Sequence, residues 1–264
     1  MNDKEIKQVL LNMLIEFDDY CNKHNLKYVL DFGTLLGAIR HHGFIPWDDD
    51  VDVSMPRTDY DRLIELQKTN PLNDRYKLEC IELNNSPYPF IKMIDSKTKI
   101  INSKSSLHTS LWIDIFPIDG MRRTDKERNK DYKKKERYAF LLENACCQLG
   151  SGKTFLKKIV KFFVILYSKI KGPYYYGNKI RNIALSDNYD NANYVCMVVW
   201  GNFNVKNFLT KEQYFDLIRV DFEGHMFNAP KEYDLHLRNT YGDYMKLPPE
   251  NQRVNHGTKA EYID

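Results

Sequence analysis

The stretch from Leu30 to Met55 constrains the fold most, because it contains four aspartates within five residues. In Asp50-Val51-Asp52-Val53, acidic and apolar side chains alternate. Side chains alternate between the two faces of a β-strand, so this pattern predicts a strand with both carboxylates on one face. Neighbouring carboxylates repel unless a cation lies between them, and oxygen ligands suit Mg²⁺ or Mn²⁺. Asp50 and Asp52 are therefore predicted to bind a divalent metal ion.

A solvated acidic turn is the alternative for this aspartate cluster. Phe44, Ile45 and Trp47 precede it, and apolar flanks favour the entry to a buried strand. Buried carboxylates need a partner, which favours the metal site over the turn. Earlier in the stretch, Gly33 and Thr34 open an apolar helix pattern that runs to His41. The unpaired amides and positive dipole end of such a helix would suit a phosphate group.

The segment FGTLLGAIRHHGFIPWDDDVDVSMPR, residues 32–57, resembles the LicD family of phosphotransferases, relatives of fukutin and fukutin-related protein in the nucleotidyltransferase superfamily. Looser similarity extends to about residue 256. The superfamily usually has Gly-Gly or Gly-Ser and a shorter spacer before Asp-x-Asp, whereas this chain has Gly33-Thr34 and a longer spacer, as LicD proteins do. The resemblance implies an α+β fold, with a nucleotidyltransferase-like mixed β-sheet flanked by helices and a helical middle section.

Composition is consistent with one compact unit. The 264 residues are 42% hydrophobic, which is enough for an ordinary core. We expect a catalytic core over 1–120, a mainly helical basic insertion over 121–200, and a C-terminal segment over 201–264 that completes the active site. A net charge of +3 is too small to indicate nucleic-acid binding. The five cysteines show no zinc spacing, and the N-terminus lacks a signal-peptide pattern, so a cytoplasmic protein with reduced thiols is expected.

Periodicity and capping residues predict most of the secondary structure. The expected helices are Asp3–His24, a helix capped by Thr58 and Asp61 to Gln67, a helix capped by Thr124 and Glu127 to Gln148, a helix capped by Thr210 and Gln213 to Val220, and Pro230–Gly242. The expected strands are Leu26–Leu30, Tyr76–Ile81, Pro89–Ile94, one within Ser110–Gly120, Tyr194–Val199 and a short strand or turn over Phe222–Ala229.

Asp114 is the one carboxylate in the middle of the apolar segment from Trp112 to Phe116. A buried aspartate at such a position is costly unless it is neutralised. A hydrogen bond from a neighbouring loop is one explanation. The superfamily resemblance implies another, because it has a third metal-binding carboxylate on a neighbouring strand. Asp114 would then complete a metal site with Asp50 and Asp52.

The middle of the chain is basic and amphipathic. Between residues 153 and 176, lysines alternate with Phe, Ile, Leu and Val. Such a helix can lie on an anionic membrane surface, or it can pack against the protein with snorkelling lysines. Both interpretations stay open. Peripheral membrane contact through 153–176 would place the protein at the inner face of the cell membrane.

The family resemblance implies transfer of phosphocholine from CDP-choline to a hydroxyl of a cell-surface glycan precursor, with release of CMP. The glycan would be a teichoic acid, lipopolysaccharide or capsule, and its precursor lipid-linked. Asp48 is a candidate general base or a supporting residue beside the metal site, although it could simply cap a turn. Arg40 and Lys92 are candidates for phosphate contacts, and His256 is a further candidate for substrate binding.

A choline headgroup calls for aromatic faces, because its quaternary ammonium forms no ordinary hydrogen bonds. Candidates are Trp47, Trp112, Trp200 and the Tyr174–Tyr176 run, but core packing is the simpler explanation for any one of them, and the sequence does not identify the choline site. Two other functions compete with phosphocholine transfer. One is transfer of ribitol or glycerol phosphate from a CDP donor, which would favour polar residues around the polyol. The other is an idle subunit that binds a nucleotide, although the intact set of aspartates argues against it.

Overall fold

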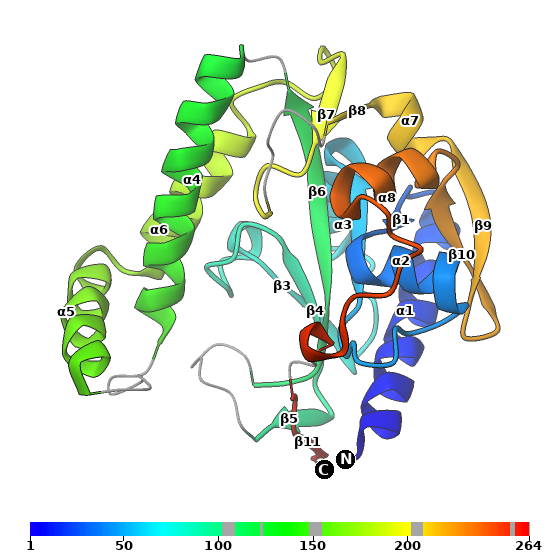
Figure 1. The fold of residues 1–264 in the computed structure, drawn as a ribbon, viewed down its shortest axis with the longest axis horizontal. Helices are drawn as coiled ribbons and strands as arrows, with labels where there is room; N and C mark the ends of the chain where they lie inside the picture. Colours follow the sequence, from blue (N-terminus) through cyan, green and yellow to red (C-terminus); the bar gives the residue numbers. More distant parts are fainter. Residues whose placement is uncertain (102–108, 122–123, 148–154, 202–207, 254–256, 264) are drawn as a thin grey trace.

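The computed structural model describes residues 1–101, 109–121, 124–147, 155–201, 208–253 and 257–263, with the side chains of 155–160 left aside (Figure 1). The α-helices are α1 (Asp3–His24), α2 (Phe32–His41), α3 (Arg57–Leu66), α4 (Asp125–Cys146), α5 (Phe155–Lys171), α6 (Pro173–Ala184), α7 (Lys211–Phe215) and α8 (Tyr233–Tyr241). Short 3₁₀ helices span Ile81–Leu83 and Glu250–Gln252. The strands are β1 (Val29–Leu30), β2 (Asp52–Pro56), β3 (Tyr76–Glu79), β4 (Ile91–Asp95), β5 (Thr98–Ile100), β6 (Trp112–Met121), β7 (Tyr194–Cys196), β8 (Leu209–Thr210), β9 (Leu217–Phe222), β10 (His225–Pro230) and β11 (Ala260–Tyr262).

The long strand β6 is the centre of a mixed seven-stranded sheet with the order β1-β2-β6-β4-β3. The first part of β6 pairs in parallel with β2 and antiparallel with β4. Its last residues pair with β7, which in turn pairs with β8. The expected α+β fold with a mixed sheet is confirmed.

Side chains of β6 point alternately to the two faces of the sheet, and the two faces have different surroundings. Ile113 and Ile115 are completely buried in a hydrophobic cluster that also contains residues of α1, α2 and α3. Phe116 and Ile118 belong to a second cluster, which contains residues of α4, α6 and β7. In Figure 1, α4, α5 and α6 accordingly lie on one side of β6, and α1, α2, α8 and the β9–β10 hairpin lie on the other. Asp114 shares its face with Phe116, on the side of α4 and α6.

Local signals predicted several elements correctly. The apolar residues of α1 recur every three or four positions, and they are buried as expected. Thr124 and Glu127 form the predicted capping box of α4, and Thr210 and Gln213 form that of α7. Asp114 lies in a strand, as predicted.

Other boundaries differ from the predictions. The aspartate strand β2 begins at Asp52, so Asp50 precedes it. Helix α2 begins at Phe32, with Asp31 as its N-cap, and not at the Gly33-Thr34 pair. The predicted cap of α3 by Thr58 is wrong, because that helix begins one residue earlier and Pro56 makes no side-chain cap.

Two further differences concern the second half of the chain. The basic stretch forms two helices, because Gly172 adopts a φ of 77° and Pro173 starts α6. Helix α7 ends at Phe215 and not at Val220, since the following residues pair with β10 in a hairpin. Pro230 ends β10 and does not start the predicted helix Pro230–Gly242, because α8 starts three residues later.

Candidate active site

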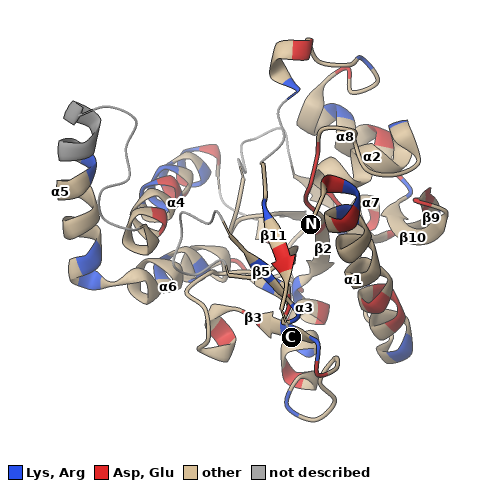
Figure 2. Ribbon diagram, turned by 90° about the horizontal axis from the view of Figure 1, so that it is seen from below, with Lys and Arg blue, Asp and Glu red and all other residues tan. Residues whose placement is uncertain are grey.

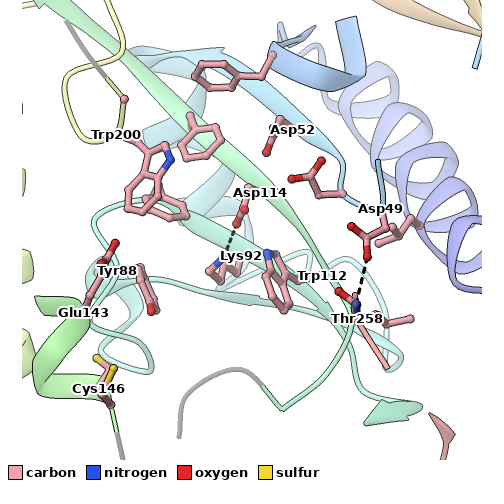
Figure 3. A pocket seen from close by; sticks show the side chains of 18 residues that line it. Asp49, Asp52, Tyr88, Lys92, Trp112, Asp114, Glu143, Cys146, Trp200 and Thr258 are labelled. Atoms are coloured by element: carbon pink, nitrogen blue, oxygen red, sulfur yellow. Dashed lines mark hydrogen bonds and ion pairs between the residues drawn. The ribbon is translucent and has the colours of Figure 1, made fainter. Parts of the chain in front are cut away.

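Three adjacent strands place Asp52, Lys92 and Asp114 in one row. Asp114 is the register partner of Asp52 in the β2–β6 pair and of Lys92 in the β4–β6 pair. Directly paired residues point to the same face of a sheet. Figure 3 shows the resulting contact, in which Lys92 Nζ donates to Asp114 Oδ1 at 2.6 Å. The sheet thus brings two predicted metal ligands and one predicted phosphate contact together.

Asp49 and Asp50 extend the acidic side of this site. Both line the same pocket as Asp52 and Asp114. Burial, the charge of Asp48 and a hydrogen bond with Asp48 raise the pKa of Asp50 to about 8. Burial also raises the pKa of Asp52 well above its ordinary value, and the charges of Asp50 and Asp114 add to this. Carboxylates therefore face one another in a poorly hydrated place, where a cation would be stabilised.

The chemistry of this group fits a hard divalent cation. Asp50, Asp52 and Asp114 offer carboxylate oxygens, which Mg²⁺ and Mn²⁺ prefer, and no thiolate or imidazole donor lies among them. Across the described ranges, no three His, Cys, Asp or Glu side chains are already spaced as a metal site. Lys92 is bonded to Asp114 in this arrangement, so binding of an ion there requires side-chain movement.

Thr34 and Gly33 contact the acidic residues. Thr34 is almost completely buried, and its hydroxyl accepts a hydrogen bond from the Asp52 amide at 2.9 Å. A Cβ atom on Gly33 would lie 2.4 Å from Asp48 Oδ2, so a larger residue there would make that carboxylate shift. Both residues thus support the positions of aspartates. Phosphate binding by this pair stays a prediction.

Asp31 is a buried carboxylate that joins several elements behind the site. It accepts hydrogen bonds from the Phe32 amide at 2.8 Å and from the Ser54 hydroxyl at 2.6 Å. It also contacts the Tyr214 hydroxyl and His236 Nε2, each at 2.7 Å. Asp31 therefore ties the start of α2 to β2, α7 and α8. Because its own backbone amide donates to the Asp52 carbonyl, this network also positions the aspartate strand.

A pocket of about 590 Å³ lies over this row of residues. The Lys92 ammonium is 4.3 Å from the ring centre of Trp112, 5.2 Å from that of Phe90 and 5.3 Å from that of Tyr88. The Trp200 ring centre is 5.5 Å from that of Phe90. Figure 3 shows Trp200, Tyr88 and Glu143 on the side of the pocket away from Asp49. The whole lining consists of Leu10, Phe32, Asp49, Asp50, Asp52, Tyr88, Phe90, Lys92, Leu111, Trp112, Asp114, Phe116, Glu143, Cys146, Cys147, Trp200, Gly201 and Thr258.

Several predicted site residues do not line this pocket. Arg40 donates to the Tyr244 carbonyl at 2.6 Å. Trp47 packs against the core, and the Arg253 guanidinium lies 5.1 Å from its ring. The Tyr174–Tyr176 run starts α6, away from the pocket lining. Asp48 contacts Asp50 but is not part of the lining, which favours its supporting role over that of a base. His256 lies outside the described residues.

Other residues of the site were not predicted from the sequence. Tyr88 and Phe90 precede Lys92 at two-residue spacing, and this alternation is a signal that could have found them. Glu143 comes from the C-terminal part of α4, and no local pattern relates it to the strands. The same is true of Tyr214 and His236, which reach Asp31 from distant parts of the chain.

Comparison with known proteins identifies the family of this chain. The family model described as "LicD/FKTN/FKRP, nucleotidyltransferase domain" matches residues 25–147, which include every predicted metal ligand. The lipopolysaccharide cholinephosphotransferase LicD of Haemophilus influenzae is 32% identical over 98% of this chain and 97% of its own length. An uncharacterized protein of Rickettsia prowazekii, RP689, is 40% identical over 62 residues, or 24% of this chain and 22% of its own length. With similarity that extends over nearly the whole of both chains, this protein belongs to the LicD family.

Proposed function

We propose that this protein transfers phosphocholine from CDP-choline to a hydroxyl of a cell-surface glycan precursor, with release of CMP. Its full-length similarity to a lipopolysaccharide cholinephosphotransferase supports the reaction class and the kind of acceptor. The observation that carries the proposal is the pocket itself, where an acidic row lies beside aromatic walls. The phosphates of CDP-choline, with a divalent cation, fit the acidic row, and the quaternary ammonium fits the aromatic walls.

Asp50, Asp52 and Asp114 would hold Mg²⁺ or Mn²⁺ in this enzyme. When bound, a divalent cation would neutralise the negative charge of the pyrophosphate and the charge that develops on the CMP leaving group. Thr34 and the Asp31 network hold Asp52 in place, and Asp48 holds Asp50. Rigid support of this kind keeps electrostatic groups oriented before the reaction begins.

Lys92 has the clearest role among the protein's own cations. It lies on the floor of the pocket, beside Asp114, with its ammonium group close to three aromatic rings. Because the ammonium is nearly buried, its charge is poorly screened by water. We assign it to a non-bridging oxygen of the donor pyrophosphate.

The reaction exchanges one phosphorus–oxygen bond for another. The acceptor hydroxyl oxygen attacks the phosphorus that carries choline, and the bond from this phosphorus to the oxygen shared with CMP breaks. CMP leaves with that oxygen and its electron pair, and the hydroxyl proton passes to a carboxylate. Asp49 lines the pocket, whereas Asp48 does not, so we assign Asp49 as the acceptor of this proton. Asp48 is then a positioning residue for Asp50.

The aromatic walls favour choline over a polyol. Tyr88 and Trp200 lie on the side of the pocket away from Asp49, and Glu143 adds a carboxylate near Tyr88 (Figure 3). Phe90 contacts Trp200 and also lines the pocket. Aromatic faces and a carboxylate attract a quaternary ammonium. A ribitol or glycerol group would lose hydrogen bonds to water against these apolar walls. Transfer of a polyol phosphate remains the second candidate function.

The donor assignment is tested by CMP release from CDP-choline, CDP-ribitol and CDP-glycerol in the presence of lipopolysaccharide precursor. We expect release from CDP-choline with Mg²⁺, and loss of release when EDTA is added. Release from a polyol donor alone would contradict the choline assignment. Undiminished release in EDTA would contradict the metal site.

Trp200→Leu is expected to raise the KM for CDP-choline about tenfold, since a desolvated cation–π contact contributes about 1–2 kcal/mol. The kcat should change much less, because the ring contacts the headgroup and not the reacting phosphorus. Trp47→Leu is a matched control, as Trp47 packs outside the pocket. Equal KM changes in the two variants, measured by CMP release, would contradict a choline site at Trp200.

A further inference from the structure

Helix α5 presents an apolar face to solvent. The exposed fractions are 64% for Phe163, 56% for Tyr167 and 75% for Ile170, and Phe162 and Leu166 are also exposed. Successive residues are about 100° apart around a helix, so these five side chains share one face. Ile165 and Ser168, on the other face, are completely buried, where α5 packs against α4 and α6. The exposed face is therefore not needed for packing within the described protein.

The charged residues in the sequence around this face are all basic. No Asp or Glu occurs between Glu143 and Asp187, whereas eight Lys and Arg residues do. Within α5, Lys169 and Lys171 are exposed and lie at the two edges of the apolar face. Long lysine side chains at such edges can extend to lipid phosphates while the apolar residues enter the acyl region. The eight basic residues are Lys153, Lys157, Lys158, Lys161, Lys169, Lys171, Lys179 and Arg181.

The position of α5 leaves this face accessible. In Figure 1 the helix forms one lateral edge of the molecule, with the β9–β10 hairpin at the opposite edge, and Figure 2 shows lysines along it. In the described parts of the chain, no helix is long and apolar enough to cross a membrane. A helix with one apolar face and basic borders is instead typical of one that lies in the plane of a membrane surface.

We propose that the exposed face of α5 (Phe162, Phe163, Leu166, Tyr167 and Ile170) binds the surface of a membrane that contains anionic lipids. The apolar stripe supplies the insertion, and the lysines supply the attraction to negative headgroups. Glu143, Cys146 and Cys147, at the end of the helix that precedes α5, line the pocket. Membrane binding would therefore hold the pocket rim near the lipid surface, where a lipid-linked acceptor could reach it. This last consequence rests on the proposed function, but lipid binding does not.

Vesicle flotation of the full chain tests the inference directly. Vesicles of phosphatidylcholine alone are compared with vesicles that also contain phosphatidylglycerol. We expect flotation with the anionic vesicles, and weaker flotation in about 0.5 M NaCl, where surface charges are screened. The double variant Phe163→Asn/Ile170→Asn should lose about tenfold in vesicle affinity, and Lys169→Gln/Lys171→Gln should lose about fivefold or more. Met226→Asn is the matched control, since Met226 is 50% exposed in the β9–β10 hairpin.

Three outcomes would overturn the proposal. The protein could stay at the bottom of the gradient with both kinds of vesicle, or the Phe163→Asn/Ile170→Asn variant could float as the unaltered protein does. Light scattering could instead show a dimer that this variant dissociates, which would assign the face to a second copy of the chain. The α5 variants should still release CMP with a water-soluble acceptor. A failure of membrane binding can therefore be distinguished from a failure of the proposed function.

Discussion

Asp52→Asn is expected to lower the kcat for CMP release by about 100-fold to 1,000-fold, the cost of removing one electrostatic group at a reacting phosphate. Asp52 pairs directly with Asp114 at one end of the row, and the charge of Asp50 also acts on it. The amide of asparagine carries no charge to hold a divalent cation. The Mg²⁺ concentration for half-maximal activity should rise as well. Steady-state CMP release over a range of Mg²⁺ concentrations measures both effects.

The same substitution should stabilise the metal-free protein. Burial and neighbouring carboxylates raise the pKa of Asp52 well above its ordinary value, so at neutral pH folding requires uptake of a proton or burial of a charge. Asparagine removes that cost. We expect the Tm without divalent ions to rise by about 2–4 °C, which corresponds to about 1 kcal/mol in a chain of this size. Asp19→Asn, on the exposed side of α1, is the control and should change neither activity nor Tm.

An Asp52→Asn variant with normal turnover would exclude the metal role proposed for this residue. A variant with low activity and a lowered Tm would instead indicate that the row supports the fold. The combination of lower activity and higher stability is specific to a site where like charges are kept for function.

Features that depend on neighbouring residues could be predicted from the sequence. The capping box of Thr124 and Glu127 is formed within a few residues, so its residues identify it wherever the helix packs. The alternation of side chains around Asp52 and Asp114 is also a local pattern, so it predicted that both residues lie on strands. The pairing of these two strands came from the family resemblance and not from either pattern.

The rest of the site could not be predicted because it is assembled over long distances in the chain. Glu143 comes to the pocket from α4 and lies in no pattern that indicates a partner. Trp200 was one of several aromatic candidates, and no local pattern distinguished it from Trp47. The pairing of β5 with β11 joins Ile100 to Ala260 through strands of three residues each, too short for a periodic signal. The sequence showed that α5 is amphipathic. It did not show which of its faces packs against α4 and α6 and which is exposed.

Asp31→Ala is expected to be the most destabilising single change near the site, with a loss of about 3–5 kcal/mol in the free energy of unfolding. Alanine leaves Ser54, Tyr214 and His236 without the carboxylate that joins them, and each is a polar group in a buried place. Urea unfolding measures the loss. Ser54→Ala is the matched control, since it removes one hydrogen bond of the network and should cost only about 1 kcal/mol.

A second variant, Asp31→Asn, distinguishes a charged Asp31 from a neutral one through the pH dependence of the unfolding free energy. Burial alone would raise the pKa of Asp31, but His236 and the hydrogen bonds from Ser54 and Tyr214 outweigh it, so the pKa lies below its ordinary value. A lowered pKa in the folded state contributes stability above the unfolded pKa of 3.8, and this contribution is lost as the pH falls through the folded value. The difference in unfolding free energy between the unaltered protein and Asp31→Asn should therefore shrink below about pH 4. A difference that stays constant down to the lowest pH at which the protein folds would mean that Asp31 is neutral, and its partners would then act through uncharged hydrogen bonds alone.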